Sequence, residues 1–275
     1  MLMSSLDTGV VLGVFSALAV AAFVWAIRDS IRRRDVLPVA ACVGALICSL
    51  NEPIYDFLGK LVYARDNPVA FTAFDRSIPW FLVFSYVPWV GLLPYLIARA
   101  IGAGMSRGRL HAVAAGSFTS VVVVEFIGTS LHTWGYYGVV PLKFLPVAPQ
   151  MAAAPIVTGF LLYTSDQLLR GWHRIFLVVI PTLAFPMVFA SVSWPLYVAN
   201  HSDLAPVANW LVAIVMLCLT VAVIGGTTAL AARWREMASY VPVTRSGVHL
   251  VDHRGEVDTL VPHGLPQGTE CVERP

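Results

Sequence analysis

Three acidic residues stand in apolar stretches of the sequence, where they are candidates for chemistry. Glu52 and Asp56 lie in the segment Ser-Leu-Asn-Glu-Pro-Ile-Tyr-Asp-Phe-Leu-Gly, and Glu125 follows four consecutive valines. An acid at the centre of a membrane-spanning helix costs about 2.5–3.5 kcal/mol on insertion scales, so such residues are functional candidates by default. The spacing of four places Glu52 and Asp56 on one face of a helix.

Pro53 is expected to interrupt the helix that carries these two acids. Proline removes a backbone donor, and it disfavours helical geometry at the preceding Glu52. Irregular backbone at membrane depth is tolerated where it lines a cavity, so we expect Glu52 and the neighbouring Asn51 to belong to a site. The alternative is an interfacial helix end with solvated acids, and for Asp56 both interpretations stay open.

Glu125 shares its helical face with Thr129 and His132, which follow four and seven residues later. The preceding valines argue against a solvated carboxylate, and we therefore expect a functional group. The alternative is a structural carboxyl group that bonds one helix to another.

A carboxylic acid in an apolar cavity retains its proton near neutral pH and can act as a general acid. Aromatic faces stabilise cations by about 2 kcal/mol or more when desolvated, and a dry cavity protects a reactive cation from water. These features predict protonation of an alkene or epoxide followed by ring closure. An aromatic belt at the membrane interface is the alternative for some of the candidate rings. The candidate substrate-binding rings are Trp80, Tyr86, Trp89, Trp194 and Tyr197.

The composition indicates that helices in a membrane position these residues. Hydrophobic residues make up 57% of the 275 residues and charged residues only 12%. A soluble domain has roughly 25% charged residues, about twice the share in this chain. The low charge together with the high apolar content excludes a disordered chain, a nucleic-acid binder and a small disulfide scaffold. We predict an all-α, polytopic membrane protein with a bundle of seven transmembrane helices. The predicted spans are Thr8–Ile27, Val36–Leu58, Ile78–Ile101, Leu110–Leu131, Gln150–Leu169, Ile175–Val198 and Pro206–Ala232.

The placement of Lys and Arg predicts the orientation. The loops after the first, third and fifth spans and the C-terminal tail hold 14 of the 18 basic residues. Cytoplasmic loops carry such an excess, so we expect the N-terminus outside, the C-terminus in the cytoplasm and a multi-pass protein of the cell membrane. The first span has its arginines after the apolar run, which predicts an anchor and not a signal peptide.

Two domains are predicted, namely a transmembrane domain over residues 1–232 and a polar cytoplasmic tail over residues 233–275. The tail is polar, with scattered Pro and Gly, and is expected to be largely disordered. Its His249, His253 and His263 are expected to be solvated, and no metal site is predicted. In the cytoplasmic half of the membrane, Asp166 stands near the end of the fifth predicted span and is expected at the membrane interface near Arg170.

The seven-span layout and the Asn-Glu-Pro-Ile-Tyr-Asp segment resemble the small integral-membrane terpene cyclases of fungal meroterpenoid and actinobacterial indolosesquiterpenoid pathways. The resemblance covers roughly residues 8–232. It implies a metal-independent isomerase or lyase without cofactor, which acts on a membrane-dissolved isoprenoid or prenylated small molecule. It also implies that Glu52 is the catalytic acid, and that a second acid lies late in the chain, for which Asp203 is the nearest candidate.

Two other functions stay open. A proton-coupled transporter would use Glu52 or Glu125 as its proton relay. The prolines of the third and sixth spans suggest broken helices at matching positions of two halves, which point to a transporter site. A membrane sensor or assembly subunit would use the outer acids to contact a partner.

Overall fold

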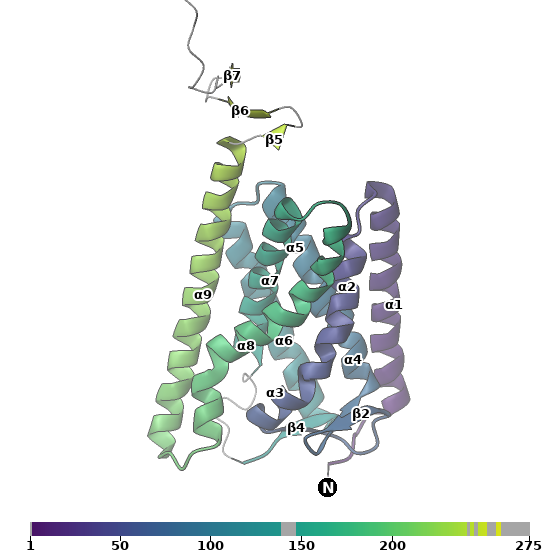
Figure 1. The fold of residues 1–275 in the computed structure, drawn as a ribbon. Coiled ribbons are helices and arrows are strands. Elements are labelled where there is room, and N and C mark those ends of the chain that lie inside the picture. Colours follow the sequence, from purple (N-terminus) through teal and green to yellow (C-terminus); the bar gives the residue numbers. More distant parts are fainter. Residues whose placement is uncertain (1, 139–146, 241–242, 245–246, 252–256, 260–275) are drawn as a thin grey trace, which may run out of the picture. The chain divides into compact units, whose positions relative to one another are not determined.

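The computed structural model describes residues 2–138, 147–240, 243–244, 247–251 and 257–259. The chain is mostly helical, as predicted (Figure 1). Within these residues, six helices are long and apolar enough to cross a membrane. They cover Thr8–Arg33, Leu37–Gly59, Trp80–Gly102, Arg107–Ser130, Gly171–Asn200 and Val207–Met237.

Local capping explains the bounds of helix α1 (Thr8–Arg33). The Asp7 carboxylate accepts a hydrogen bond of 2.7 Å from the backbone N–H of Gly9, which satisfies a free donor at the helix start. Arg34 adopts the left-handed conformation, with φ of 52°, and ends the helix.

The second predicted span is interrupted beside the acids. Helix α2 (Leu37–Cys48) passes into a short 3₁₀ turn, η1 (Ser49–Asn51), and then into α3 (Glu52–Gly59). The expectation that Glu52 itself leaves helical geometry is wrong, because its φ and ψ are −54° and −43°. Pro53 lies in the first turn of α3, where its missing N–H has no intrahelical partner to lose.

The third predicted span contains a π-helical segment. Helix α4 (Trp80–Tyr86) continues through the π segment η2 (Val87–Leu92) into α5 (Leu93–Gly102). A Cβ added to Gly91 would lie 2.8 Å from the Cα of Cys42, so glycine allows η2 and α2 to approach closely. π-Helical turns inside α-helices frequently occur at functional sites, and this one carries Trp89.

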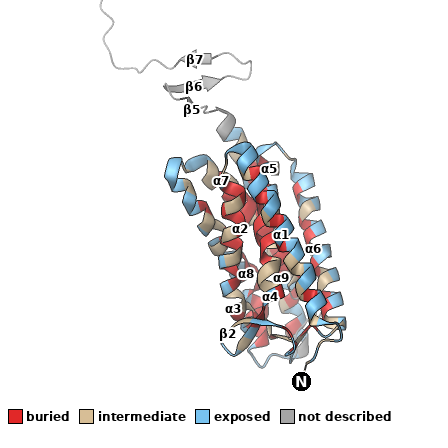
Figure 2. Ribbon diagram, turned by 90° about the vertical axis from the view of Figure 1, so that its right-hand side faces the viewer, coloured by how far each residue is buried: buried red, intermediate tan, exposed pale blue. Residues whose placement is uncertain are grey.

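Helix α7 (Ala148–Leu168) lies among other helices and packs against α5, α8 (Val179–Asn200) and α6 (Arg107–Ser130). It corresponds to the fifth predicted span but is not one of the six helices apolar enough to cross a membrane. A helix covered by protein needs small residues for close packing more than it needs large apolar ones. Ala153 and Ala154 are fully buried, and a Cβ at Gly159 would lie 2.6 Å from the Ile97 side chain. Figure 2 shows the buried residues concentrated in such interior helices.

The remaining helices follow the predicted sixth and seventh spans. A 3₁₀ segment, η3 (Gly171–Val178), precedes α8, and α8 stays α-helical through Pro186 and Pro195. Helix α9 (Pro206–Tyr240) extends beyond the predicted end at Ala232.

The chain forms two compact units, Met1–Ala231 and Ala232–Pro275. In the second unit, strands β5 (Val243–Thr244), β6 (Gly247–Val251) and β7 (Val257–Thr259) pair antiparallel in that order. The predicted disorder of the tail stays a prediction, since much of this unit lies outside the described residues.

Two short antiparallel strand pairs, which the sequence did not predict, lie in the first unit. Strand β1 (Leu61–Tyr63) pairs with β4 (Trp134–Tyr136), and β2 (Val69–Ala73) pairs with β3 (Arg76–Pro79). Strands β1 and β4 have three residues each and are too short to show a period-two pattern. The Asn67 amide joins the loop between β1 and β2 to the loop between α6 and β4. It donates to the backbone oxygen of Ala64 in the first loop at 3.1 Å and to that of Thr133 in the second at 3.2 Å.

Ion pairs join the loop after α1 to the region around η3. Arg174 donates to Asp35 at 2.7 Å and also to Asp166. The sequence led us to expect Asp166 near Arg170, whereas its ion pair in the structure is with Arg174. Helix α7 ends at Leu168, and Arg170 has an extended backbone. These contacts hold together the two arginine-containing loops that follow α1 and α7.

Candidate functional site

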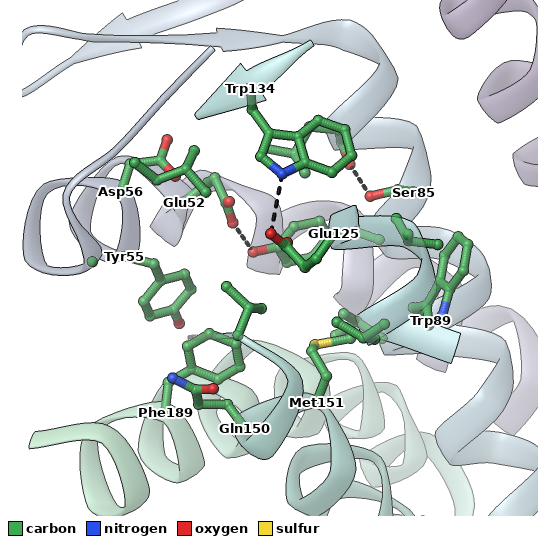
Figure 3. A pocket seen from close by; sticks show the side chains of 18 of the residues that line it. Glu52, Tyr55, Asp56, Ser85, Trp89, Glu125, Trp134, Gln150, Met151 and Phe189 are labelled. Carbon is green, nitrogen blue, oxygen red and sulfur yellow. Dashed lines mark hydrogen bonds between the residues drawn. The ribbon is translucent and has the colours of Figure 1, made fainter. Parts of the chain in front are cut away.

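A cavity of about 150 Å³ lies between the helices and is closed on one side by the β1–β4 pair (Figure 3). Its walls are mainly aromatic and aliphatic, and its titratable side chains include the three predicted acids, Glu52, Asp56 and Glu125. An apolar cavity of comparable size can stay dry and bind a small apolar molecule. The cavity thus combines carboxyl groups with an apolar, aromatic surface.

Glu52 is held by two tyrosines. The Tyr63 hydroxyl donates to Oε1 at 3.0 Å, and the Tyr86 hydroxyl donates to Oε2. Tyr63 comes from β1 and Tyr86 from the last position of α4, so two separate elements orient this carboxyl group. Both oxygens of Glu52 have a donor, which stabilises the carboxylate that remains after a proton is lost.

Glu125 has a corresponding pair of donors. Trp134 Nε1 donates to Oε2 at 3.1 Å, and the Tyr136 hydroxyl donates to the same oxygen at 2.8 Å. Glu125 is 7% exposed, near the end of α6, and both donors come from β4. The carboxyl group therefore points into the cavity and is fixed by the strand that follows its own helix.

The β1–β4 pair supplies donors to both acids. Tyr63 is opposite Trp134 and Leu61 is opposite Tyr136 in the antiparallel register. Opposite residues share a face of the pair, as do residues two apart on a strand, and all four side chains line the cavity. Burial raises the pKa of Tyr63 and of Tyr136 well above the ordinary tyrosine value, so both hydroxyl groups remain donors.

Gly128 makes room for the Trp134 ring. A Cβ at this position of α6 would overlap three ring carbons of Trp134. The absence of a side chain therefore lets the indole lie against the helix and reach Glu125.

Asp56 connects this cavity with a second one of about 540 Å³. Asp56 and Tyr63 are the residues that line both cavities. Asp56 is 2% exposed, and its Oδ2 has no hydrogen-bond partner among the described residues. Its carboxyl group lies one helical turn from Glu52 and within electrostatic reach of both Glu52 and Arg76. The second cavity is polar, with Arg65, Asp75 and Arg76 in its walls.

Six of the residues predicted for the site meet at the first cavity. They come from four separate segments, namely α3, the α4–η2 region, α6 and α8. They are Glu52, Asp56, Tyr86, Trp89, Glu125 and Tyr197.

The other five predicted site residues do not line the cavity. The Asn51 amide donates to the Cys48 carbonyl at 3.1 Å. Trp80 and Trp194 are 42% and 54% exposed, which fits the alternative of an interfacial aromatic belt. His132 and Asp203 are both exposed.

His132 leaves the face of Glu125 because helix α6 ends at Ser130, and His132 itself has φ of +54°. Its Nδ1 lies 3.2 Å from the Ser5 hydroxyl. Asp203 lies in the loop between α8 and α9. Helical periodicity does not extend into either of these segments.

Several residues of the site were missed or assigned differently. Tyr55, Tyr63 and Gln150 line the cavity but carried no sequence signal beyond their types. In the sequence, Trp134 and Tyr136 are only two aromatic residues that follow the fourth predicted span. Their proximity to an acid nine to eleven residues earlier depends on the turn that follows α6.

Among the described residues, no group of three or more His, Cys, Asp and Glu side chains could hold a metal ion. His253 and His263 lie outside the described residues. The chain matches no protein-family model, no curated protein and no solved structure.

Proposed function

We propose that the protein is an integral-membrane terpene cyclase, which protonates an alkene or epoxide of an isoprenoid or prenylated substrate and guides cationic ring closure. The observation that carries this proposal is the shared cavity: Glu52 and Glu125 face one apolar chamber, and each carboxyl group has two aromatic hydrogen-bond donors. The resemblance of the Asn-Glu-Pro-Ile-Tyr-Asp segment to small membrane cyclases supports the same reaction.

In the proposed reaction, Glu52 is the general acid. Its proton adds to the alkene carbon or the epoxide oxygen, and positive charge develops on the neighbouring carbon. The hydrogen bonds from Tyr63 and Tyr86 stabilise the carboxylate that remains. An electron pair from a second double bond then forms the new carbon–carbon bond, while the surrounding aromatic rings stabilise the moving charge.

Glu125 is the proposed terminating base. It begins each turnover as a carboxylate and accepts the proton lost from the carbon beside the final cation, and the two electrons of that C–H bond form the product double bond. Glu125 then releases this proton to the medium, which balances the proton that Glu52 takes up. Trp134 and Tyr136 orient the accepting carboxylate. Asp203 and His132, which the sequence also suggested for the site, do not line the cavity.

Asp56 is the proposed relay that restores the proton of Glu52. It lines both cavities and lies one helical turn from Glu52, so a proton can enter from the second cavity without admitting water to the apolar one. Arg65, Asp75, Arg76 and Tyr63 are the charged or titratable groups around this path. The proton comes from hydronium or a buffer acid in the medium.

We also propose a multi-pass protein of the cell membrane, with seven crossing helices, the N-terminus outside and the C-terminus in the cytoplasm. The six long apolar helices support the membrane location, and the placement of the basic residues supports the orientation. Helix α7 is the proposed seventh crossing, because its neighbours cover its more polar surface.

The direct test incubates membranes that contain the protein with prenylated aromatic substrates, either as alkenes or as terminal epoxides. We expect a product with the mass of the substrate and one double bond or one epoxide fewer, detected by mass spectrometry. Membranes with Glu52→Gln are the control and should give none. An isomeric product formed equally well by the control membranes would remove Glu52 from the reaction.

A proton-coupled transporter is the second candidate, because buried acids can also relay protons. The helix interruptions lie at different places in the proposed halves, however, since η2 lies inside the third span, whereas η3 lies at the start of the sixth and α8 stays helical through two prolines. Acid-dependent solute flux into liposomes, without a chemical product, would identify the transporter. If the Glu52→Gln variant instead failed to bind a partner protein that the wild-type protein binds, a sensor or assembly subunit would be indicated.

A further inference from the structure

The apolar cavity contains a polar corner that the protonation chemistry does not use. Gln150, at the start of α7, is 1% exposed, and its Oε1 has no hydrogen-bond partner among the described residues. The Tyr55 hydroxyl on α3 also has none. Both residues line the cavity (Figure 3).

Tyr197 lies beside Gln150 and lines the same cavity. The Gln150 Oε1 atom is buried and has no hydrogen-bond partner among the described residues. Tyr55 is in turn within electrostatic reach of Tyr197. The corner therefore presents an acceptor from Gln150 and a rotatable hydroxyl from Tyr55.

The Tyr55 ring packs against two phenylalanines, which have no hydrogen-bonding group. The ring of Phe189 lies 4.6 Å from that of Tyr55, centroid to centroid, and Phe185 also contacts the Tyr55 ring at 6.3 Å. Buried polar groups in native proteins nearly always have a partner, because an unpaired group loses its hydration without replacement. Two unpaired polar atoms in an otherwise aromatic corner thus indicate a ligand group.

We propose that this corner binds a hydroxyl group of the substrate, which makes the ligand an isoprenoid alcohol or another isoprenoid that carries a free hydroxyl. The proposal deepens the cyclase function and rests on it for the isoprenoid character of the ligand. A hydroxyl can donate to Gln150 Oε1 and accept from Tyr55. An ether or a carbonyl can only accept and leaves Gln150 unsatisfied, and a hydrocarbon satisfies neither.

The test measures binding and needs no reaction. The purified full-length protein in lipid nanodiscs is titrated with geraniol, geranyl methyl ether and myrcene. All three contain a ten-carbon isoprenoid skeleton. The alcohol can donate and accept a hydrogen bond, the ether can only accept one, and the hydrocarbon can do neither. We expect geraniol to bind at least 10-fold more tightly than the ether or the hydrocarbon. Gln150→Leu should remove most of that preference while myrcene binding persists, and comparison within identical nanodiscs cancels partitioning of the probes into lipid.

Tyr55→Phe is the second variant, for the case in which Gln150→Leu does not fold, and it should reduce the preference for geraniol. Equal affinities of the wild-type protein for geraniol and myrcene would overturn the proposal and leave the corner to ordered water. A preference that is unchanged in a folded variant would overturn it as well.

The cyclase function can fail separately. Asp203→Asn should keep the preference for geraniol, since Asp203 is exposed and lies outside the cavity. A clear preference without cyclisation of any substrate would support the hydroxyl site and contradict the proposed reaction. Cyclisation without any preference for an alcohol would support the proposed reaction and contradict the hydroxyl site.

Discussion

Tyr63 and Trp134 lie directly opposite each other in the β1–β4 pair, and each donates a hydrogen bond to a different buried acid. The Tyr63 hydroxyl reaches Glu52 at 3.0 Å, and Trp134 Nε1 reaches Glu125 at 3.1 Å. One strand pair therefore orients both carboxyl groups toward the same cavity. A change that displaces either strand should affect both acids.

Glu52→Gln should lower cyclisation on the order of 100- to 10,000-fold, the usual contribution of a general acid, because the isosteric amide cannot supply the proton. Asp203→Asn is the matched control, since Asp203 is an exposed acid outside the cavity. It should keep wild-type product formation, measured by mass spectrometry on membranes with equal protein content. Loss of product in Asp203→Asn would return that residue to the mechanism.

Asp56→Asn should separate the first turnover from later ones. Glu52 keeps its first proton, so one equivalent of product should form at the normal rate, and later turnovers should slow on the order of 100-fold because the relay is absent. Rapid-quench measurement of product per enzyme resolves the two phases. Asp203→Asn is the control, as Asp203 lines neither cavity. An equal slowing of the first turnover would place Asp56 in the chemical step itself.

Trp89→Leu should change the product mixture more than it changes the yield of folded protein. Trp89 lines the cavity from the π segment, and a desolvated cation–π contact of about 2 kcal/mol corresponds to roughly 30-fold in the partition between competing cations. Trp194→Leu removes an exposed tryptophan outside the cavity and should leave the mixture unchanged. The measurement is the ratio of products, separated by chromatography, for each of the two variants and for the wild-type protein. Identical ratios in both variants would make Trp89 a purely structural residue.

Gly128→Ala should destabilise the protein and reduce product formation. Alanine normally stabilises a helix interior by roughly 0.5–1 kcal/mol relative to glycine, but here the methyl group meets the Trp134 ring, and overpacking costs about 1–3 kcal/mol. Gly116→Ala on the same helix is the control, since its Cβ would meet no atom within 4 Å. Thermal unfolding midpoints should fall for Gly128→Ala and stay equal or rise for Gly116→Ala. Unchanged activity and midpoint in Gly128→Ala would show that Trp134 can move without consequence.

The sequence by itself determined the mostly helical fold and the apolar segments. Hydropathy and helix length are local properties, so they could be read without knowing which segments pack together. The same reasoning singled out Glu52 and Glu125, because a charged residue in an apolar run is conspicuous wherever the run is placed.

Only the tertiary structure decided which side chains surround those acids. Tyr63 reaches Glu52 and Trp134 reaches Glu125 through the pairing of two three-residue strands, which are too short to leave a pattern. His132 and Asp203 fell outside the cavity, because the helix before each of them ends and helical spacing no longer predicts where a side chain points. Gln150 became a candidate because tertiary packing buries one of its polar atoms without a partner.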